Sequence, residues 1–275
     1  MSAIANKFID AAGIRTHYLE AGDGGSPAIL IHGGGPGADA TTNWTGCLPV
    51  LAREHRVFAP DMVGFGTTAK PDSARYSYSQ GERIDWLASF VQALGLGPVT
   101  LVGNSMGGAA ALGVATRHSQ LVSKLILMGS AGLRLTEPPS PELKAIQDYD
   151  FTFEGMLRMI KGLTAKGYEP AEAVVRYRLE SSLRPDNRDA YGRIMAWNRQ
   201  HSLNFDEDEV RSVQAPTLVI AGKEDKVVPL SNAFRFLQLI PQSWGCIIPG
   251  CGHWVMIERP TEFCEIVLRF LAGKA

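Results

Sequence analysis

Short, unbroken apolar runs recur along this chain and constrain its fold more than any other feature. They lie at residues 28–31, 56–59, 100–103, 124–128, 217–221 and 246–248. Such runs are typical of strands that are buried on both faces of a sheet. Segments with helical spacing of apolar residues separate them, at 86–94, 109–116, 234–239 and 263–271. Because strands and helices alternate, the sequence predicts an α/β fold with a mostly parallel, doubly wound sheet.

The start of the chain follows a different pattern. Residues 7–10 and 14–20 alternate apolar and polar side chains on either side of Ala12-Gly13. This alternation predicts a half-buried hairpin at one edge of the sheet, and it raises the number of predicted strands to eight.

One long segment interrupts the alternation of strands and helices. Residues 135–208 contain no strand-like run, and helical patterns occur in them at 155–160 and 190–197. We therefore expect a core of residues 1–134 and 209–275, with residues 135–208 inserted between two core strands as a helical lid.

Composition and charge narrow the class of protein. The 275 residues are 45% hydrophobic and 20% charged, with a formal net charge of -1. Such a balance is typical of a globular protein, and it offers a polyanion no long-range attraction, so nucleic acid is not an expected partner. No stretch approaches the roughly 20 apolar residues of a spanning helix, and the start lacks a signal-peptide pattern. We expect a cytoplasmic protein without a membrane partner.

The cysteines indicate neither a disulfide framework nor a metal site. Four of them in so long a chain are too few for such a framework. Two have a spacing that suits a metal, but the apolar residues 247–249 between them favour a strand end. We expect buried free thiols at Cys47, Cys246, Cys251 and Cys264, and no metal ion.

The segment Gly103-Asn-Ser105-Met-Gly107 joins a predicted strand to a predicted helix. A serine on so sharp a turn has a strained backbone, and glycines at both flanks let neighbouring chains approach closely. This arrangement lifts the hydroxyl clear of the sheet. The sequence therefore predicts that Ser105 is a nucleophile.

A serine nucleophile needs a base, and the base needs an acid that fixes its tautomer. Asp225 and His253 each follow a predicted strand. The order Ser, Asp, His at the carboxyl ends of strands is that of α/β-hydrolases. Glu224 is the alternative acid. The remaining histidines outside the glycine run lie in polar segments that indicate the surface: His17, His55, His118 and His201.

A run of glycines, His32-Gly-Gly-Gly-Pro-Gly37, follows the predicted strand 28–31. Backbone N–H groups there, with that of the residue after the nucleophile, suit an oxyanion. We expect the donors to be Gly34 and Met106. A phosphate-binding loop is the alternative, but no Lys-Ser or Lys-Thr follows the glycines.

These motifs together resemble the meta-cleavage product hydrolases, bacterial serine hydrolases that cut a carbon–carbon bond in ring-fission products of aromatic compounds. The resemblance covers nearly the whole chain and is strongest within the family to hydrolases of the carbazole, dibenzofuran and biphenyl pathways. It rests on His32–Gly37, Asn43, Asp61-Met-Val-Gly-Phe-Gly66, Gly103–Gly108, Gly222–Pro229 and Cys251-Gly-His-Trp254.

The resemblance implies a substrate class and a set of contacts. The substrates are 2-hydroxy-6-oxohexa-2,4-dienoates, here with a 6-phenyl group, and no cofactor is required. The family's lid arginine falls on Arg178, with Arg176 as the alternative. The expected polar and aromatic contacts are Asn43, Asn104, Gly33 and Trp254, although Asn43 is also compatible with a helix N-cap. The resemblance further favours a homo-oligomer.

The substrate's sixth-carbon group and the class of protein remain open at this point. The aryl group is expected to lie against lid residues Met156, Leu157, Met159, Ile160, Met195 and Trp197. A 6-alkyl dienoate is the alternative substrate, and an ester or lactone hydrolase the alternative enzyme, because a triad does not choose the scissile bond. A ligand-binding protein that has kept the fold is a third reading, against which the complete triad argues.

Overall fold

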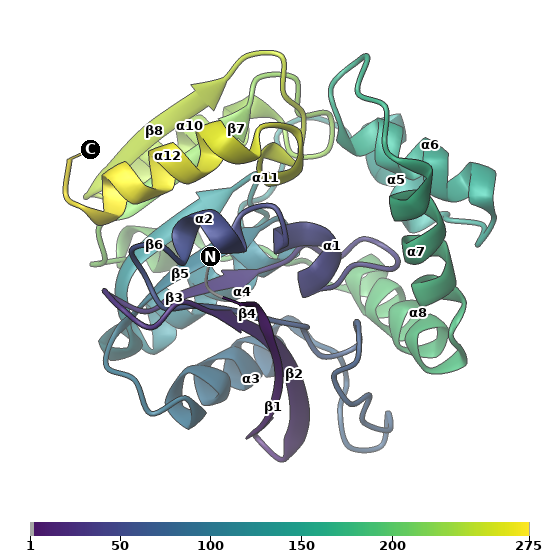
Figure 1. Ribbon diagram of the computed structural model, residues 1–275. Helices are drawn as coiled ribbons and strands as arrows, with labels where there is room; N and C mark the ends of the chain where they lie inside the picture. The colour runs from purple at the N-terminus through teal and green to yellow at the C-terminus, as the bar shows by residue number, and fades with distance from the viewer. Residues whose placement is uncertain (1–2, 275) are drawn as a thin grey trace.

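Eight strands form one sheet in the computed structural model, which describes residues 3–274 (Figure 1). Their order is β1-β2-β4-β3-β5-β6-β7-β8. The strands are β1 (Ala5–Ala11), β2 (Ile14–Ala21), β3 (Ala28–Ile31), β4 (Val57–Pro60), β5 (Val99–Asn104), β6 (Val122–Met128), β7 (Thr217–Gly222) and β8 (Ser243–Ile248). The hairpin β1–β2 lies at one edge of the sheet. The pairs β1–β2 and β2–β4 are antiparallel, and the other five pairs are parallel. The predicted fold class is confirmed.

Alternate side chains of the central strands enter two separate hydrophobic clusters. Ile29 and Ile31 of β3 pack into one cluster, whereas Leu30 packs into the other. This period-two alternation explains why the central runs are apolar at every position. The prediction of burial on both faces is wrong for β8, because β8 is the last strand of the sheet. Its residue Trp244 is 42% exposed.

Helices cover both faces of the sheet. On one face lie α3 (Gln80–Ala93), α4 (Met106–Arg117), α9 (Glu207–Arg211) and α10 (Leu230–Leu239), with a short 3-10 turn, Ser119–Leu121, after α4. On the other lie α1 (Ala40–Trp44), α2 (Leu48–Leu51), α11 (Val255–Glu258) and α12 (Pro260–Leu271), with α2 and α12 toward the viewer in Figure 1. The four longer helices match the predicted segments. The shorter ones were missed because one turn is too short to display a helical period.

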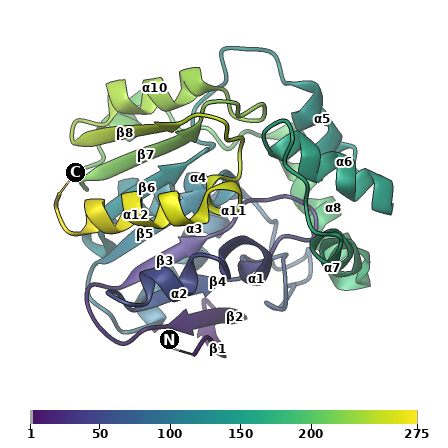
Figure 2. The same ribbon diagram turned by 45° about the horizontal axis from the view of Figure 1, so that its top comes forward.

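The chain between β6 and β7 contains helices and no strand. Besides α9, these are α5 (Pro141–Gln147), α6 (Phe153–Leu163), α7 (Glu172–Leu183) and α8 (Pro185–Gln200). We call α5–α8 the inserted helices. They form a separate layer at one end of the sheet, beyond the helices that cover its faces (Figure 2). Thr152 caps α6 by accepting a hydrogen bond from the Gly155 N–H, so this helix begins where its apolar face first meets the core.

All four cysteines are free thiols. Cys47, Cys251 and Cys264 are buried as expected, but Cys246 is only half-buried, because it lies on the edge strand β8. Among residues 3–274, no three His, Cys, Asp or Glu side chains come together as a metal site. Within the same residues, no helix has the length and apolar character needed to cross a membrane.

Candidate active site

Ser105 lies on the turn between β5 and α4, where its φ is 56° and its ψ is -120°. A side chain rarely adopts a positive φ, and such strain persists only where the surroundings enforce it. A Cβ on Gly103 would lie 2.5 Å from the Gly107 oxygen, and one on Gly107 would collide with the His32 oxygen. Both flanking positions therefore require glycine, and the predicted strand, sharp turn and helix are confirmed.

His253 and Asp225 form a buried pair. The His253 Nδ1 atom lies 2.7 Å from Asp225 Oδ2, and the two side chains are 2% and 1% exposed. The other carboxylate oxygen of Asp225 accepts hydrogen bonds from the Val227 and Val228 N–H groups, at 2.8 and 2.9 Å. Glu224 is exposed, so Asp225 is the acid of the two that contacts the histidine.

Gly129 lies against this pair. It has a φ of +49°, and a Cβ there would be 3.0 Å from His253 Nδ1 and 3.1 Å from Asp225 Oδ2. A larger residue at the end of β6 would therefore push the acid and the base apart. Sequence reasoning did not assign Gly129 to the site, because nothing local distinguishes it from other loop glycines.

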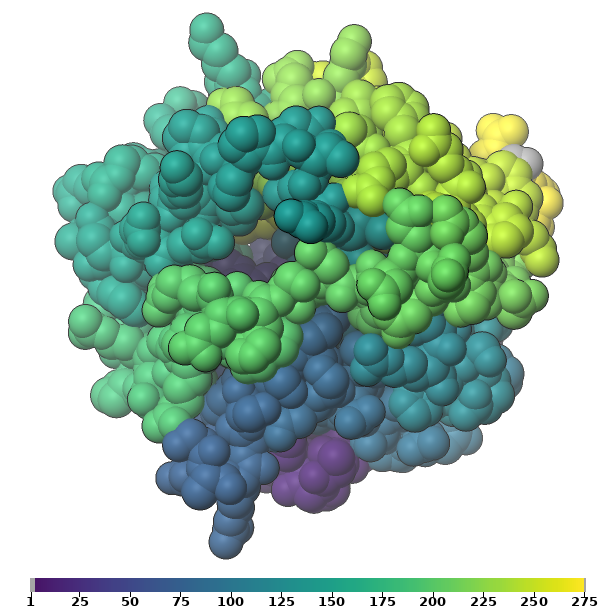
Figure 3. All heavy atoms as spheres, turned by 180° about the vertical axis from the view of Figure 1, so that it is seen from behind, coloured from purple at the N-terminus to yellow at the C-terminus, as the bar shows by residue number. Residues whose placement is uncertain are grey.

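A cavity of about 290 Å³ lies between the sheet and the inserted helices. The predicted site residues that line it are Gly33, Gly34, Asn104, Ser105, Met106, His253 and Trp254. In Figure 3 a hollow opens between the teal atoms of the chain that follows β6 and the green atoms of α8 and its following loop. Three segments far apart in sequence thus meet at the carboxyl ends of parallel strands, where open α/β sheets bind ligands.

Two backbone amides lie near the nucleophile. Gly34 and Met106 touch, since a Cβ on Gly34 would lie 3.3 Å from the Cβ of Met106. Within residues 3–274, neither N–H donates a hydrogen bond. Met106 is the first residue of α4, where the helix dipole adds positive potential. Both N–H groups therefore lack a partner among the described residues, as the predicted oxyanion donors require.

Arg178, on α7, lies behind the cavity wall and does not line the cavity. It is 1% exposed and its guanidinium lies 4.7 Å over the Trp254 ring. Nη1 donates to Thr42 Oγ1 at 3.2 Å and Nη2 to the Pro36 carbonyl at 3.1 Å. Burial lowers the pKa of Arg178 to about 10, so it remains charged at neutral pH. It forms no direct ion pair with a carboxylate of residues 3–274, although the nearby Asp39 carboxylate raises its pKa, and its Nε has no partner.

Arg176 and the two predicted asparagines differ in their position relative to the cavity. Arg176 is exposed and pairs with Glu172, so it points away from the cavity. Asn43 lies inside α1, where its Nδ2 donates to the Asp39 carbonyl at 2.8 Å, and it does not line the cavity. The alternative of an N-cap at Asn43 is wrong, because Asp39 caps that helix. Asn104 donates to the Met128 carbonyl at 3.1 Å and leaves its buried Oδ1 unpartnered.

The apolar wall of the cavity differs from the expected one. Of the six lid residues, only Met195 lines the cavity. Met156, Met159 and Ile160 on α6 are buried in one hydrophobic cluster, and Leu157 packs half-buried against it. Trp197 stacks on His201. The wall is instead made by Leu133, Leu135, Leu143, Ile146, Leu163, Leu203, Val227 and Val228. The sequence could have indicated two of these residues, since Val227 and Val228 lie two and three positions after Asp225, the candidate acid.

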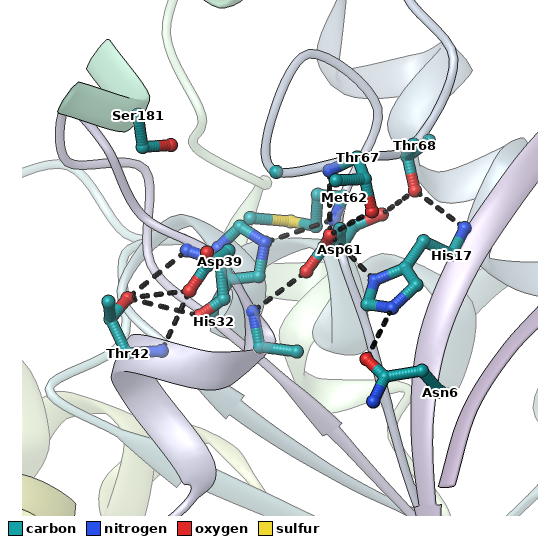
Figure 4. A network of polar contacts seen from close by, with 12 residues as sticks. Asn6, His17, His32, Asp39, Thr42, Asp61, Met62, Thr67, Thr68 and Ser181 are labelled. Atoms are coloured by element: carbon teal, nitrogen blue, oxygen red, sulfur yellow. Dashed lines mark hydrogen bonds and ion pairs between the residues drawn. The ribbon is translucent and has the colours of Figure 1, made fainter. Parts of the chain in front are cut away.

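The assignment of His17 to the surface is wrong. His17 is 7% exposed, and its Nδ1 lies 2.8 Å from Asp61 Oδ2 (Figure 4). The loop after β4 covers this side of β2, and no local pattern reveals such a cover. His55 and His118 are half-buried, and His201 is exposed at the cavity mouth.

The model of the α/β-hydrolase fold family matches residues 27–260. A 2-hydroxy-6-oxo-6-(2'-aminophenyl)hexa-2,4-dienoic acid hydrolase from Metapseudomonas resinovorans is 49% identical over 276 residues, covering 100% of this chain and 93% of its own. A 2-hydroxy-6-oxo-2,4-heptadienoate hydrolase from Pseudomonas putida is 34% identical, covering 100% of this chain and 99% of its own. A solved meta-cleavage product hydrolase from Pseudomonas fluorescens superposes with a TM-score of 0.90 at 34% identity, over 98% of each chain.

The chain belongs to the meta-cleavage product hydrolases. The resemblance stated from its motifs is confirmed, and so is the α/β-hydrolase fold. Like the other members, this meta-cleavage product hydrolase is an enzyme that hydrolyses carbon–carbon bonds in small molecules.

Proposed function

We propose that this enzyme hydrolyses a 6-aryl-2-hydroxy-6-oxohexa-2,4-dienoate to 2-hydroxypenta-2,4-dienoate and an aromatic acid. One observation carries the proposal: the cavity holds Ser105 and His253 between an apolar wall and the end behind which Arg178 is buried without a direct ion pair. A substrate that fits must be anionic at one end, apolar at the other and electrophilic between them.

The charge at the arginine end supports an anionic substrate. A buried cation without a paired anion is destabilising, because few groups replace the water it has lost. Arg178 lies directly behind Gly35, whose Cβ would be 3.3 Å from its Nη2, and behind the ring of Trp254. We place the substrate carboxylate and 2-hydroxyl at this end, with Asn104 and Gly33 as further contacts. The contact expected from Asn43 stays a prediction of the sequence, because Asn43 does not line the cavity. A carboxylate there would provide the ion pair that the protein itself lacks.

The proposed mechanism uses the buried pair and the two free amides. The substrate first ketonises, which moves a proton to C5 and makes the C5–C6 bond cleavable. Ser105 attacks the C6 carbonyl while His253 accepts its proton and Asp225 holds the imidazole. Gly34 and Met106 stabilise the oxyanion. The C5–C6 bond breaks, its electron pair leaves with the dienolate fragment, and His253 gives its proton to that fragment, which departs as 2-hydroxypenta-2,4-dienoate. His253 then accepts a proton from the water that attacks the acyl group and returns it to the Ser105 oxygen as the aromatic acid leaves.

The choice between an aryl and an alkyl group rests on the wall. The first relative acts on a 6-aminophenyl substrate and the second on a heptadienoate, whose sixth carbon carries a methyl group. Eight aliphatic side chains surround the space next to Ser105, which favours the larger apolar group. This choice also agrees with the higher identity to the first relative.

We expect kcat/KM for a 6-phenyl dienoate to exceed that for the 6-methyl analogue by at least about tenfold, or roughly 1.4 kcal/mol. A phenyl ring buries more apolar surface than a methyl group does, at roughly 25 cal/mol per Å². The loss of visible absorbance of each dienoate measures the two rates. Equal values, or a preference for the methyl compound, would contradict the aryl assignment and leave the mechanism intact.

Ester or lactone hydrolysis is separable by the same measurement. If p-nitrophenyl esters are turned over faster than any dienoate, the substrate class is wrong while Ser105 keeps its role.

We further propose that residues 135–208 act as a lid over a core of residues 1–134 and 209–275. A homo-oligomeric state and a cytoplasmic location remain predictions of the sequence.

A further inference from the structure

We propose that His32 is a positioning residue of the oxyanion site: its ring holds the Gly33–Gly34 peptide so that the Gly34 N–H faces the attacked carbonyl. His32 precedes the glycine run, is fully buried and does not line the cavity. The inference rests on the proposed role of Gly34 and extends it to a side chain outside the cavity.

Two hydrogen bonds determine the protonation of the His32 ring. The Met62 N–H donates to Nε2 at 2.9 Å, so Nε2 carries no proton. Nδ1 lies 2.8 Å from the Gly33 carbonyl oxygen, and a ring whose Nε2 accepts must donate from Nδ1. Burial lowers the pKa of His32, which agrees with a neutral ring. Phe65 packs edge-on against it, with ring centroids 5.2 Å apart.

The bond to Gly33 determines where the next amide points. The Gly33 carbonyl and the Gly34 N–H belong to one planar trans peptide, so they point in opposite directions. His32 holds the carbonyl on the buried side, and the N–H therefore points toward the cavity. The peptide lies close to the nucleophile, since a Cβ on Gly33 would be 3.3 Å from Ser105 Cβ. Glycines resist rotation of a peptide less than other residues do, so an external hold is needed here.

The Met62 end of this arrangement is itself fixed (Figure 4). The Asp61 carboxylate accepts hydrogen bonds from the N–H groups of Ala40 at 2.8 Å and Thr67 at 2.9 Å, and it contacts His17. The Asp61 carbonyl accepts a hydrogen bond from Thr68 Oγ1 at 2.7 Å. Because both the side chain and the backbone of Asp61 are held, the following N–H of Met62 has a fixed direction. His32 thus links a rigid buried network to a flexible glycine loop.

A pair of variants separates positioning from general stability. His32→Asn keeps a donor near the Nδ1 position for the Gly33 carbonyl and loses the acceptor for Met62. His32→Gln keeps an acceptor near Nε2 and loses the donor. In other hydrolases, removing one hydrogen-bond donor to the oxyanion lowers kcat about 100- to 1,000-fold. A donor that is present but misdirected should lower kcat somewhat less. We expect His32→Gln to lower kcat about 30- to 100-fold with KM nearly unchanged, and His32→Asn to stay within about fivefold of the wild type.

The rate of Ser105 acylation by p-nitrophenyl acetate provides a readout that needs no dienoate. It should fall in His32→Gln by a factor similar to that for kcat. If the wild type is acylated but turns over no dienoate, the proposed function fails and the acylation rates still test His32. Equal losses in the two variants, wild-type rates in His32→Gln, or an effect confined to KM would overturn the proposal.

A measurement on the unaltered protein covers the case in which a variant does not fold. Nitrogen chemical shifts of enzyme with isotope-labelled histidine rings distinguish the two neutral tautomers of a histidine from its cation. We expect His32 to carry its proton on Nδ1 at neutral pH, whereas a neutral histidine side chain exposed to water prefers to carry it on Nε2. A proton on Nε2, or a cationic ring, would contradict the donation to Gly33.

Discussion

Ser105→Ala is expected to lower kcat by at least about three orders of magnitude, because removing one member of such a triad abolishes nucleophilic attack. The variant should still bind the dienoate, since alanine removes only the hydroxyl, and the apolar wall and Arg178 remain. Stopped-flow absorbance measures both quantities: a spectral change on binding, followed by slow or absent decay.

Ser73→Ala is a matched control, because Ser73 is exposed on a loop outside the cavity. It should retain wild-type turnover. Alanine also relieves no backbone strain, since position 105 keeps its positive φ in both proteins, so the melting temperatures should be similar. Wild-type turnover in Ser105→Ala would rule out the assigned nucleophile.

Arg178→Gln is expected to lower kcat/KM by roughly 2 to 5 kcal/mol, or about 30- to 4,000-fold, when the substrate carboxylate loses its only buried cation. Arg176→Gln is the control, because Arg176 differs in position by half a helical turn and is exposed. Its effect should be small, since surface ion pairs contribute roughly 0 to 1 kcal/mol. If the two effects are reversed, the assignment to Arg178 is wrong.

Arg178 also links α7 to α1 through Thr42 and to the loop after β3 through Pro36, so its loss could act through structure. Hydrolysis of p-nitrophenyl acetate separates the two causes, because this ester carries no carboxylate. Arg178→Gln should change ester hydrolysis far less than dienoate hydrolysis. Parallel losses on both substrates would mean that Arg178 has a structural role and does not recognise the anion.

Several features of the site could be predicted because they are local. The turn at Ser105 depends on the sterics of its immediate neighbours, and Gly103 and Gly107 are close in sequence to the residue they accommodate. The positions of Asp225 and His253 follow from strand periodicity, since residues after parallel strands meet at one edge of the sheet. The hairpin at Ala12-Gly13 is equally local, and its place at the sheet edge is confirmed. The predicted half-burial is wrong for β2, which is buried at every position except Arg15, because neighbouring strands and the loop after β4 cover it.

Long-range contacts decided the remaining features. Arg176 and Arg178 have similar local sequence, and only the packing of α7 on Pro36 and Thr42 buries one of them. The cavity wall, the burial of His17 and the exposure of Trp244 likewise depend on which distant segment covers each residue. The sequence by itself determined the order of elements and the reacting groups, because backbone sterics and side-chain periodicity act over a few residues. The tertiary structure alone decided the cavity wall and the contacts of His32 with Gly33 and Met62, because burial is a property of segments brought together by folding.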